Sequence, residues 1–460
     1  RSHFGSRWGM FFPLLLALLL RPHVADVGGT YSLVADAGST GTRVYLFRVN
    51  MSGDGKVQIT DMGKGPALSS FKDAPAKAAD AVRPQLLKAK EQIPQAAHAS
   101  VSVSVFATAG MRLVAQEVQS AIYDGLKGGL LQEDFPFNRD RLRARTISGR
   151  EEGIFALIAA NYLAKNIHAS LEVAGETLMG VLDLGGSSTQ VAAPPSLQSG
   201  EHLASKLGTE HTFVRSFLKL GMERMRQRTF QSFLDAAPAA LRERRAVANP
   251  CSFYGFREDG EAWRGTGHSA TCEEAIAALL SEDKNSCVAS VGAAAAGDAA
   301  PECLGDSPVP TPHGPASTAR FFLISGYLYV TDFARWWLEQ PGVRTSSLQV
   351  LREPGAFATP SIAELREAAA VVCAEPWDGL SAAALDPARK HRFTGPHKVP
   401  HRCFELNYIV ALLSVGYGFG PTEKLFRIVE DIDGGEIEWT LGAFLHSLAS
   451  EGSDPAAQEL

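Results

Sequence analysis

Two stretches of the chain share one hydrophobic pattern. Residues 31 to 35 form an apolar run, residues 36 to 41 (DAGSTG) form a polar turn cluster, and residues 43 to 49 resume with β-branched and aromatic side chains. The same layout returns at residues 179 to 192, where an apolar run ends in Asp183 and a turn of Gly, Ser and Thr follows. Apolar runs bounded by such turns predict strand–turn–strand hairpins. We therefore expect two related hairpins, each with an aspartate at the end of its first strand.

The segment between these hairpins alternates strand and helix patterns. Valines alternate with serines over residues 101 to 105, and a helix is expected from Met111. A short strand at residues 145 to 147 is followed by SGRE at 148 to 151, which is a capping-box pattern, and by an apolar helix over residues 154 to 163. Strands that alternate with helices predict an α/β fold.

Length and charge bound the architecture and the partners. The chain has 460 residues, of which 45% are hydrophobic and 20% are charged. Single hydrophobic cores stop growing at roughly 250 to 300 residues, so two globular lobes are expected. The net charge is -6, and no run of Lys and Arg is dense enough to bind the phosphate backbone of a nucleic acid. We therefore expect no nucleic-acid partner.

Residues 1–25 have the pattern of a secretory signal peptide. An apolar run at residues 10 to 20 follows Arg1 and Arg7, and it is shorter than the roughly 20 residues of a membrane-spanning helix. A buried helix and an uncleaved anchor are the alternatives. No later segment has a membrane-spanning pattern, so the mature chain is expected to have no membrane span.

The cysteines fit an oxidising compartment. An even number of cysteines behind a signal peptide favours disulfides over a zinc site. The sequon Asn50-Met51-Ser52 agrees, because N-glycosylation occurs in the same compartment. We expect a glycoprotein of the secretory pathway, either secreted or held in the Golgi or reticulum lumen. The six cysteines all lie in the second half of the chain, at Cys251, Cys272, Cys287, Cys303, Cys373 and Cys403.

The two predicted hairpins suit the binding of a phosphate chain. Consecutive backbone N–H groups in a Gly, Ser and Thr turn converge on a concavity that can hold a phosphate. An aspartate at the end of the preceding strand, Asp36 or Asp183, is suitably placed for a hydrated Mg²⁺ or Ca²⁺ that bridges phosphate oxygens. Either cluster alone would be better explained as an ordinary hairpin turn. Its recurrence favours two hairpins that clamp a polyphosphate between them.

Hydrolysis also requires a base that takes a proton from the attacking water, and Glu151 and Glu152 are the candidates. Glu151 lies three residues after Ser148 and is expected to fold back on the start of the helix. Glu152 has no such structural task, so we favour it as the base. The alternative is that both glutamates only interact with the helix dipole.

Four further polar residues could contact the substrate. Ser188 and Gln190 follow the second Gly pair and could orient the attacking water through hydrogen bonds. Thr108 and Arg112 could contact phosphate oxygens, although Arg112 could equally be a solvated helix residue.

Taken together, these segments resemble the apyrase family of nucleoside triphosphate diphosphohydrolases. Looser similarities, such as those at residues 63–70, 249–251, 403–413 and 438–443, extend the resemblance over nearly the whole mature chain. The five segments that match the family's conserved segments, in the same order, are DAGSTGTRVYLF at 36–47, ATAGMRL at 107–113, ISGREEG at 147–153, LDLGGSSTQVA at 182–192 and, more loosely, ISGYLYVTDF at 324–333.

The resemblance implies an α/β fold of two actin-like, ribonuclease H-like lobes with the active site in the cleft between them. Residues 28–163, completed by about 426–455, would form the N-terminal lobe, and residues 164–425 the C-terminal lobe with its disulfides. Each part of the site has implied residues: Asp36 and Asp183 for the cation, through water; Ser39, Thr40, Gly41, Thr42 and Thr108 with Gly185, Gly186 and Ser187 for phosphate; Glu152 as the base; Ser188 and Gln190 for the water; and Tyr327 or Tyr329 for the nucleobase.

The resemblance also implies a subgroup and a disulfide pattern. Gly41 occupies the place where cell-surface members usually carry histidine, so the chain resembles the soluble Golgi, reticulum and plant types. Such an enzyme would use Ca²⁺ or Mg²⁺ to hydrolyse nucleoside di- and triphosphates, and we expect a monomer. The family's pairings would join Cys251 to Cys287, Cys272 to Cys303 and Cys373 to Cys403.

Two other functions compete with this interpretation. An exopolyphosphatase or sugar-kinase relative would use similar Asp-x-Gly hairpins, because fold alone does not decide function. The signal-like start, the cysteines and Gln190 oppose it. A catalytically inactive nucleotide-binding protein would keep the cleft without turnover. The presence of Glu152, Ser188, Gln190 and both aspartates opposes that alternative.

Overall fold

The computed structural model of the chain describes residues 29–50, 56–132, 135–175, 177–207, 212–291, 304, 309–311, 320–340, 358–432 and 435–451. The predicted signal segment at residues 1–25 and two residues of the predicted sequon lie outside these ranges. None of the helices that the described residues form combines the length and apolar character needed to cross a bilayer.

The first hairpin belongs to a mixed five-stranded sheet in the order β3-β2-β1-β4-β5. β1 pairs antiparallel with β2, and β2 antiparallel with β3, whereas β4 and β5 continue the sheet on the other side of β1 in parallel. The strands are β1 Thr30–Gly38, β2 Gly41–Val49, β3 Val57–Gly65, β4 Ser102–Ala107 and β5 Leu142–Thr146.

The second hairpin belongs to a second five-stranded sheet that repeats this topology. Its order is β12-β11-β6-β7-β8, with antiparallel pairs β6–β7 and β7–β8 and parallel pairs β6–β11 and β11–β12. Read from β8 to β12, the order and strand directions match those of the first sheet, so β6 occupies the place of β1. Both predicted hairpins are therefore confirmed. The strands are β6 Gly180–Leu184, β7 Ser188–Ala193, β8 Phe213–Leu218, β11 Phe321–Ser325 and β12 Phe426–Ile428.

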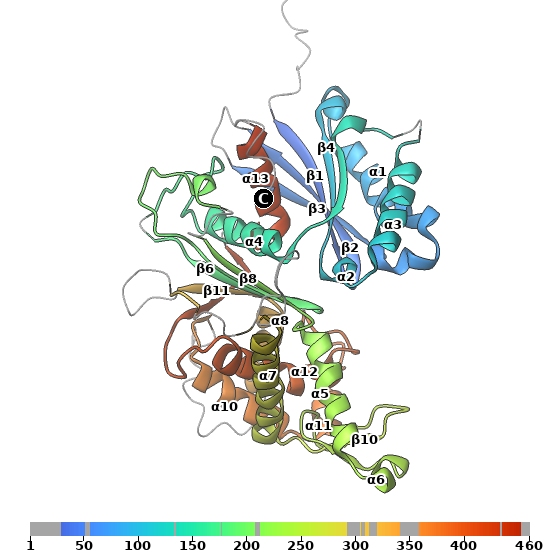
Figure 1. Cartoon of the computed structure of the whole chain (residues 1–460), viewed down its shortest axis with the longest axis vertical. Helices are drawn as coiled ribbons and strands as arrows, with labels where there is room; N and C mark the ends of the chain where they lie inside the picture. The colour runs from blue at the N-terminus through green and yellow to red at the C-terminus, as the bar shows by residue number, and fades with distance from the viewer. Residues whose placement is uncertain are drawn as a thin grey trace, which may run out of the picture.

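Helices α4 (Gly149–Leu163) and α13 (Trp439–Glu451) lie between the two sheets (Figure 1). The apolar helix predicted for residues 154 to 163 is part of α4, which is buried from Glu151 to Asn161 because it packs against α13 and against β6, β7 and β8 of the second sheet. One buried cluster joins these layers and includes Val34 and Phe47 of the first sheet, Ile158 of α4, Val181 of the second sheet and Phe444 of α13. The two sheets are thus connected through a shared core, which fixes the hairpins relative to each other.

The other helices cover the outer faces of the two sheets. In Figure 1, α1 and α3 flank the first sheet, and the helices of the C-terminal half lie beyond the second sheet. The helix expected from Met111 is split into a short α2 and a separate α3. The helices are α1 Arg83–Gln92, α2 Ala109–Arg112, α3 Gln116–Leu130, α5 Met222–Ala236, α6 Ala239–Glu243, α7 Ser269–Val291, α8 Gly326–Leu338, α10 Ile362–Cys373, α11 Trp377–Ala384 and α12 Arg402–Ala411.

Short elements complete the described chain. Two-stranded sheets are formed by β9 Val247–Asn249 with β10 Trp263–Gly265 and by β13 Asp431–Ile432 with β14 Gly435–Glu436. The lobe boundaries expected near residues 163 and 426 stay a prediction. Short 3-10 turns lie at Leu68–Asp73, Pro75–Ala81, Gln95–Ser100, Arg139–Arg141, Leu203–Ser205 and Val399–His401, and a π-helical turn extends α12 at Leu412–Gly416.

One predicted disulfide is confirmed, and the other pairings are corrected. Cys373 of α10 bonds Cys403 of α12, as expected. Cys251 bonds Cys272, with their Cα atoms 4.8 Å apart, so the expected pairings of Cys251 with Cys287 and of Cys272 with Cys303 are wrong. Cys272 and Cys287 belong to the same helix α7, and fifteen residues of helix separate them by roughly 22 Å. Cys251, which is bound at one end of α7, therefore cannot reach Cys287. Cys303 lies outside the described residues.

Gly442 sets the close approach of α13 to α4. A Cβ at this position would lie 1.8 Å from the carbonyl oxygen of Phe155. We expect Gly442→Ala to lower the free energy of unfolding by about 1 to 3 kcal/mol, as overpacking does, in urea unfolding. Gly128→Ala on α3 is the matched control, because a Cβ there meets nothing within 4 Å and should be neutral or stabilising. Equal stability of the two variants would contradict the packing of α13 described above.

Candidate active site

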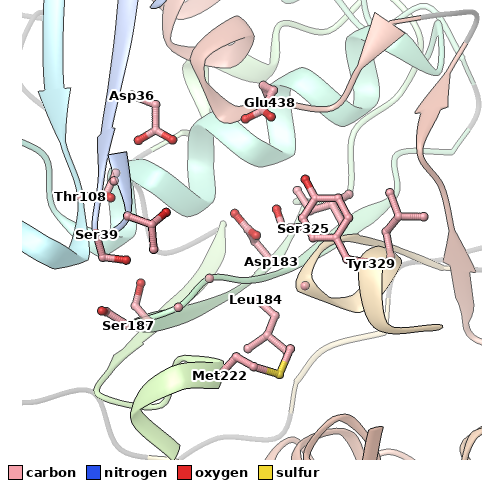
Figure 2. A pocket seen from close by; sticks show the side chains of 18 of the residues that line it. Asp36, Ser39, Thr108, Asp183, Leu184, Ser187, Met222, Ser325, Tyr329 and Glu438 are labelled. Atoms are coloured by element: carbon pink, nitrogen blue, oxygen red, sulfur yellow. The ribbon is translucent and has the colours of Figure 1, made fainter. Parts of the chain in front are cut away.

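The tips of the two hairpins meet at a cavity of about 900 Å³. A Cβ placed on Gly186 of the second hairpin would lie 3.3 Å from the hydroxyl oxygen of Ser39 in the first. Figure 2 shows Asp36 and Ser39 on one side of this cavity and Asp183 and Ser187 on the other. The cavity is therefore bounded by the two predicted phosphate-binding turns and by their two aspartates.

Neighbouring backbone holds each turn in place. In the second hairpin, the carbonyls of Gly185 and Gly186 accept hydrogen bonds from the N–H groups of Met222 and Glu223, at the start of α5. In the first hairpin, α2 packs directly on the turn, because a Cβ on Gly110 would lie 2.9 Å from Ser39 Cα. Small residues at these positions allow close backbone approach, and a phosphate-binding turn requires the same feature.

Most of the predicted phosphate-binding residues line the cavity, but Thr42 does not. Thr42 is fully buried, and its hydroxyl donates to the carbonyl of Pro66 at 2.8 Å. Its side chain therefore stabilises the hairpin and is not available to a ligand. Thr108 lines the cavity directly after β4, next to Asp36 (Figure 2). The predicted residues that line the cavity are Ser39, Thr40, Gly41, Thr108, Gly185, Gly186 and Ser187.

Asp36 lies in a strongly anionic environment. Burial raises its pKa well above the ordinary value, and the carboxylates of Glu438, Glu152 and Asp183 raise it further, with Arg43 opposing them. Its Oδ1 atom is buried and accepts no hydrogen bond from the described residues. An ionised Asp36 therefore lacks the partner that a buried charge requires.

Asp183 occupies the corresponding place at the end of β6. Burial raises its pKa, and hydrogen bonds from the Ser325 hydroxyl and the Leu184 N–H partly offset this increase. Ser325 ends β11 with φ 55° and ψ -118°, a conformation that L-residues rarely adopt. Strain of this kind persists where the surrounding structure holds it, and it is frequent at functional sites. The strained backbone of Ser325 places its hydroxyl next to the Asp183 carboxylate.

The donor set fits a divalent cation of the Ca²⁺ or Mg²⁺ type. Asp36 and Asp183 line the cavity and offer carboxylate oxygens, which hard cations prefer, and the nearby carboxylates of Glu152 and Glu438 add negative charge to the same cavity. A cation would supply the positive charge that the unbonded Oδ1 atom of Asp36 lacks. Among the described residues, no three His, Cys, Asp or Glu side chains lie close enough to hold a metal ion together. The arrangement is compatible with the expected binding through water molecules, which Mg²⁺ in particular retains.

Glu152 is buried in α4 and is surrounded by polar partners. Arg112 forms an ion pair with its Oε2 atom, and Gln190 Nε2 donates to the same oxygen at 3.0 Å. Gln190 Nε2 also donates to Ser188 Oγ at 2.8 Å. Both of these contacts to Glu152 fall on Oε2, so Oε1 is the oxygen that is available to a water molecule. The structure thus brings together Glu152, Ser188 and Gln190, as the sequence predicted. Arg112, which was expected either at a phosphate oxygen or in solvent, is instead largely buried in this ion pair and does not line the cavity.

The pKa of Glu152 is suited to proton transfer near neutral pH. Burial raises this pKa to about 7, the ion pair with Arg112 opposes the increase, and Asp183 adds to it. A general base works best when its pKa lies near the working pH. Burial therefore gives Glu152 a property that a catalytic base needs.

Glu151 has the structural role that the sequence predicted for it. The N–H of Glu151 donates to Ser148 Oγ at 3.1 Å, and the N–H of Ser148 donates to Glu151 Oε2 at 2.8 Å, so the capping box is confirmed. Although burial raises the pKa of Glu151, hydrogen bonds from Arg145 and Ser148 lower it overall. With its carboxylate occupied by Arg145 and the helix start, Glu151 is a poor candidate for the base.

The two predicted base-binding tyrosines lie in different environments. Tyr327 is fully buried, whereas Tyr329 is 39% exposed and lines the cavity. They belong to helix α8, where residues two apart point in directions about 200° apart. Phe393 also lines the cavity, and its ring centroid lies 5.4 Å from that of Tyr329. The structure therefore places Tyr329 and Phe393, and not Tyr327, where a nucleobase could stack.

The sequence did not single out four of the residues around the cavity. Ser325 and Glu438 lie in segments that resembled the family; Ser325 has no polar cluster around it, whereas Glu438 is one of several acidic residues at 430–438, which were not connected with the site from the sequence. Lys64 packs against Gly41, where a Cβ would come within 3.0 Å of its ammonium nitrogen. The alignment of β2 with β3 could have suggested this contact. Phe393 has no local signal, because only the tertiary fold brings it to Tyr329.

Comparisons with known proteins agree with this geometry. The model of the GDA1/CD39 (nucleoside phosphatase) family matches residues 25–452. The nucleoside-diphosphatase mig-23 of Caenorhabditis elegans is 26% identical over 489 residues, which cover 95% of this chain and 82% of that protein. The guanosine-diphosphatase of Schizosaccharomyces pombe is 28% identical over 451 residues, which cover 92% of this chain and 74% of that protein. A crystal structure of nucleoside triphosphate hydrolases from Neospora caninum matches with a TM-score of 0.59 at 16% identity, covering 92% of this chain and 93% of that one. That structural match confirms the predicted two-lobed fold.

Proposed function

Because the chain belongs to the GDA1/CD39 (nucleoside phosphatase) family, we propose that it hydrolyses the terminal phosphate of nucleoside di- and triphosphates by direct attack of water. Family membership over most of the chain makes it a phosphohydrolase. The observation that supports the proposal is the meeting of two hairpins with turns of Gly, Ser and Thr at one cavity, each with an aspartate at the end of its first strand. Such a pair of turns can hold two phosphates of one chain at the same time.

The residues around Glu152 would perform the proton transfer. Arg112 and Gln190 both donate to Oε2 of Glu152, so they orient the carboxylate with Oε1 free for the attacking water. Ser188 is held by Gln190 and could accept or donate a second hydrogen bond to that water. In a loose phosphoryl-transfer transition state, positioning and charge neutralisation provide most of the catalysis. No covalent phosphoenzyme is required.

Asp36 and Asp183 would hold the divalent cation from opposite hairpins, through water. A bound cation would neutralise charge on the phosphate chain and polarise a phosphoryl oxygen. Ser325 would keep the Asp183 carboxylate in position through its hydroxyl. Either Ca²⁺ or Mg²⁺ would suit the oxygen donors.

The aromatic pair favours a nucleotide over an inorganic polyphosphate. Tyr329 and Phe393 present rings to the cavity that also contains the phosphate-binding turns. Stacking of a base on an aromatic ring is favourable for every base. A polyphosphatase would have no use for these rings, and a nucleotide-binding protein without turnover would have no use for a buried base of raised pKa.

The test is phosphate release by the purified chain from ATP, ADP, GDP, UDP and tripolyphosphate, with Mg²⁺, Ca²⁺ or chelator. We expect kcat/KM for the nucleotides to exceed that for tripolyphosphate. Equal values for nucleotides and tripolyphosphate would support the exopolyphosphatase alternative. Nucleotide binding without phosphate release would support the inactive binding protein.

The raised pKa of Glu152 predicts how kcat/KM falls at acidic pH. A base acts in its ionised form, so kcat/KM should fall about tenfold per pH unit below about 7 and level off above it. The measurement is kcat/KM for ADP between pH 5 and 8 at saturating cation. A flat profile would show that no group of this pKa must be ionised.

The disulfides support a compartment within the secretory pathway. Cys251–Cys272 and Cys373–Cys403 are both buried, and such bonds persist in oxidising environments. We propose an extracellular, Golgi or reticulum location, with the soluble-type subgroup that Gly41 suggests and with a monomeric state. Mass spectrometry of the protein from a eukaryotic host would test cleavage near residue 25 and glycosylation of Asn50.

A further inference from the structure

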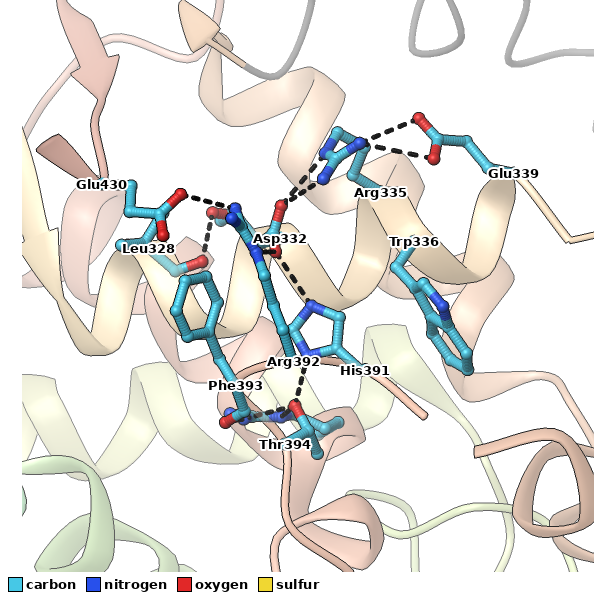
Figure 3. A network of polar contacts seen from close by, with 12 residues as sticks. Leu328, Asp332, Arg335, Trp336, Glu339, His391, Arg392, Phe393, Thr394 and Glu430 are labelled. Carbon is cyan, nitrogen blue, oxygen red and sulfur yellow. Dashed lines mark hydrogen bonds and ion pairs between the residues drawn. The ribbon is translucent and has the colours of Figure 1, made fainter. Parts of the chain in front are cut away.

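A network of polar contacts surrounds the loop that carries Phe393, one of the two rings at the cavity (Figure 3). Its centre is Asp332 on α8, one helical turn after Tyr329. Asp332 Oδ2 accepts a hydrogen bond from His391 Nε2 at 2.9 Å, and its Oδ1 accepts one from Arg335 at 2.5 Å. Asp332 and His391 are only 8% and 4% exposed. Such a buried network requires that every polar atom find a partner.

Hydrogen bonds hold both ring nitrogens of His391 in place. Arg402 donates to Thr394 Oγ1 through both Nε, at 3.2 Å, and Nη2, at 2.8 Å, which occupies both acceptor positions of that hydroxyl. The Thr394 hydroxyl therefore donates its own proton to His391 Nδ1, at 2.8 Å. His391 therefore has a hydrogen-bond partner at each ring nitrogen, Thr394 at Nδ1 and Asp332 at Nε2.

This network fixes a short loop that carries Phe393. His391 and Thr394 point into the protein and are buried, whereas Arg392 is exposed and Phe393 is half-buried at the cavity. Arg392 is held as well, because it donates to Asp332 Oδ2 at 3.3 Å and pairs with Glu430 at 2.7 Å. Its guanidinium carbon lies 4.3 Å from the centroid of the Phe393 ring. Three of the four loop residues are thus anchored, and the fourth is Phe393.

One helix therefore determines the positions of both rings. α8 carries Tyr329 itself, and through Asp332 it anchors the loop that carries Phe393. The two rings are in contact at 5.4 Å and 46°, so no base can enter between them. They instead form one continuous aromatic surface on which a base would stack.

From this arrangement we infer that Asp332, His391 and Thr394 are positioning residues, which hold Phe393 against Tyr329 as a preformed surface for the nucleobase. The inference rests on the proposed function, because it assigns this surface to the base of the same substrate. None of the three residues touches the reacting phosphate. Their loss should therefore weaken the binding of a ligand that has a base and spare a ligand that has only phosphates.

Calorimetry on the full chain tests this inference without turnover. The variants are His391→Leu, which removes both hydrogen bonds, and His391→Gln, whose amide N–H can still donate to Asp332. The probes are α,β-methylene-ADP, which has a base, and methylenediphosphonate, which has none, each with Mg²⁺. We expect His391→Leu to raise the Kd of the nucleotide analogue about tenfold and to leave that of methylenediphosphonate unchanged. His391→Gln should retain most of the wild-type affinity for both.

A double-mutant cycle with Tyr329→Ala separates positioning from a general loss of structure. If the network acts through the aromatic surface, His391→Leu should change the Kd of the analogue less than about twofold once Tyr329 is replaced. Three results would each overturn the inference. The first is equally weakened binding of both probes, the second is an unchanged Kd for the nucleotide analogue, and the third is the same tenfold effect of His391→Leu when Tyr329 is replaced by Ala. If His391→Leu does not fold, Thr394→Val provides the same comparison. Failure of the wild type to release phosphate would count against the proposed function and not against this binding result.

Discussion

Replacing Glu152 by Gln is expected to lower kcat for nucleotide hydrolysis by about 10²- to 10⁴-fold, with KM changed only a few-fold. The amide has the shape of the carboxylate, and its oxygen can still accept hydrogen bonds from Arg112 and Gln190. It cannot take a proton from water at neutral pH. The measurement is steady-state phosphate release from ADP, with binding of the nucleotide analogue measured separately.

The neighbouring glutamate provides a matched control for this variant. Glu151→Gln carries the same chemical change one residue away, where the side chain closes the capping box and pairs with Arg145. It should keep kcat within a few-fold and lose about 0.5 to 2 kcal/mol of unfolding free energy. If Glu151→Gln abolished turnover and Glu152→Gln did not, the assignment of the base would be reversed.

Replacing Asp36 by Asn should weaken the activating cation about 10- to 100-fold, as the loss of a group that acts through bound water does. Asp36 contributes a carboxylate whose Oδ1 has no protein hydrogen-bond donor among the described residues, so the cation is its expected partner. The measurement is the Ca²⁺ or Mg²⁺ concentration that gives half-maximal phosphate release. Asp61→Asn is the control, because Asp61 is an exposed aspartate of β3 and does not line the cavity.

The same variant should be more stable than the wild type when chelator is present. Burial and three neighbouring carboxylates raise the pKa of Asp36 well above its ordinary value. A raised carboxylate pKa favours folding below the unfolded-state pKa, and this contribution is lost as pH rises through the folded-state pKa. At neutral pH, the uncharged amide of the variant would avoid the cost of an ionised Asp36. Thermal unfolding with chelator should show a higher Tm for Asp36→Asn, and a lower Tm would show that Asp36 has a structural role instead.

Local sequence was sufficient to predict the hairpins and the candidate base. Asp36 and Asp183 stand in clusters whose turn residues act over a few positions, so both strand–turn–strand units could be predicted from the chain alone. The distinction between Glu151 and Glu152 was likewise local, because a capping box depends on residues three apart. The repeated topology of the two sheets then brings both hairpins to the same cavity.

Features that depend on distant contacts could not be predicted in this way. Tyr327 and Tyr329 were indistinguishable until α8 fixed which ring is buried. Phe393 reaches Tyr329 across 64 residues of chain, through a loop whose anchors are themselves distant. The pairing of Cys251 depended on which end of α7 lies beside it, and sequence spacing does not show this. Thr42 was expected at a phosphate, but its hydroxyl is bonded to the carbonyl that directly follows β3.

The most direct test of the central claim is phosphate release from ADP by the purified chain, with Ca²⁺ or Mg²⁺ and then with excess chelator. The facing hairpins and their aspartates predict release that requires the cation and stops when the chelator is added. Release that continues at the same rate in chelator would contradict a cation held by Asp36 and Asp183. The absence of release from folded protein with either cation would contradict the nucleotidase itself.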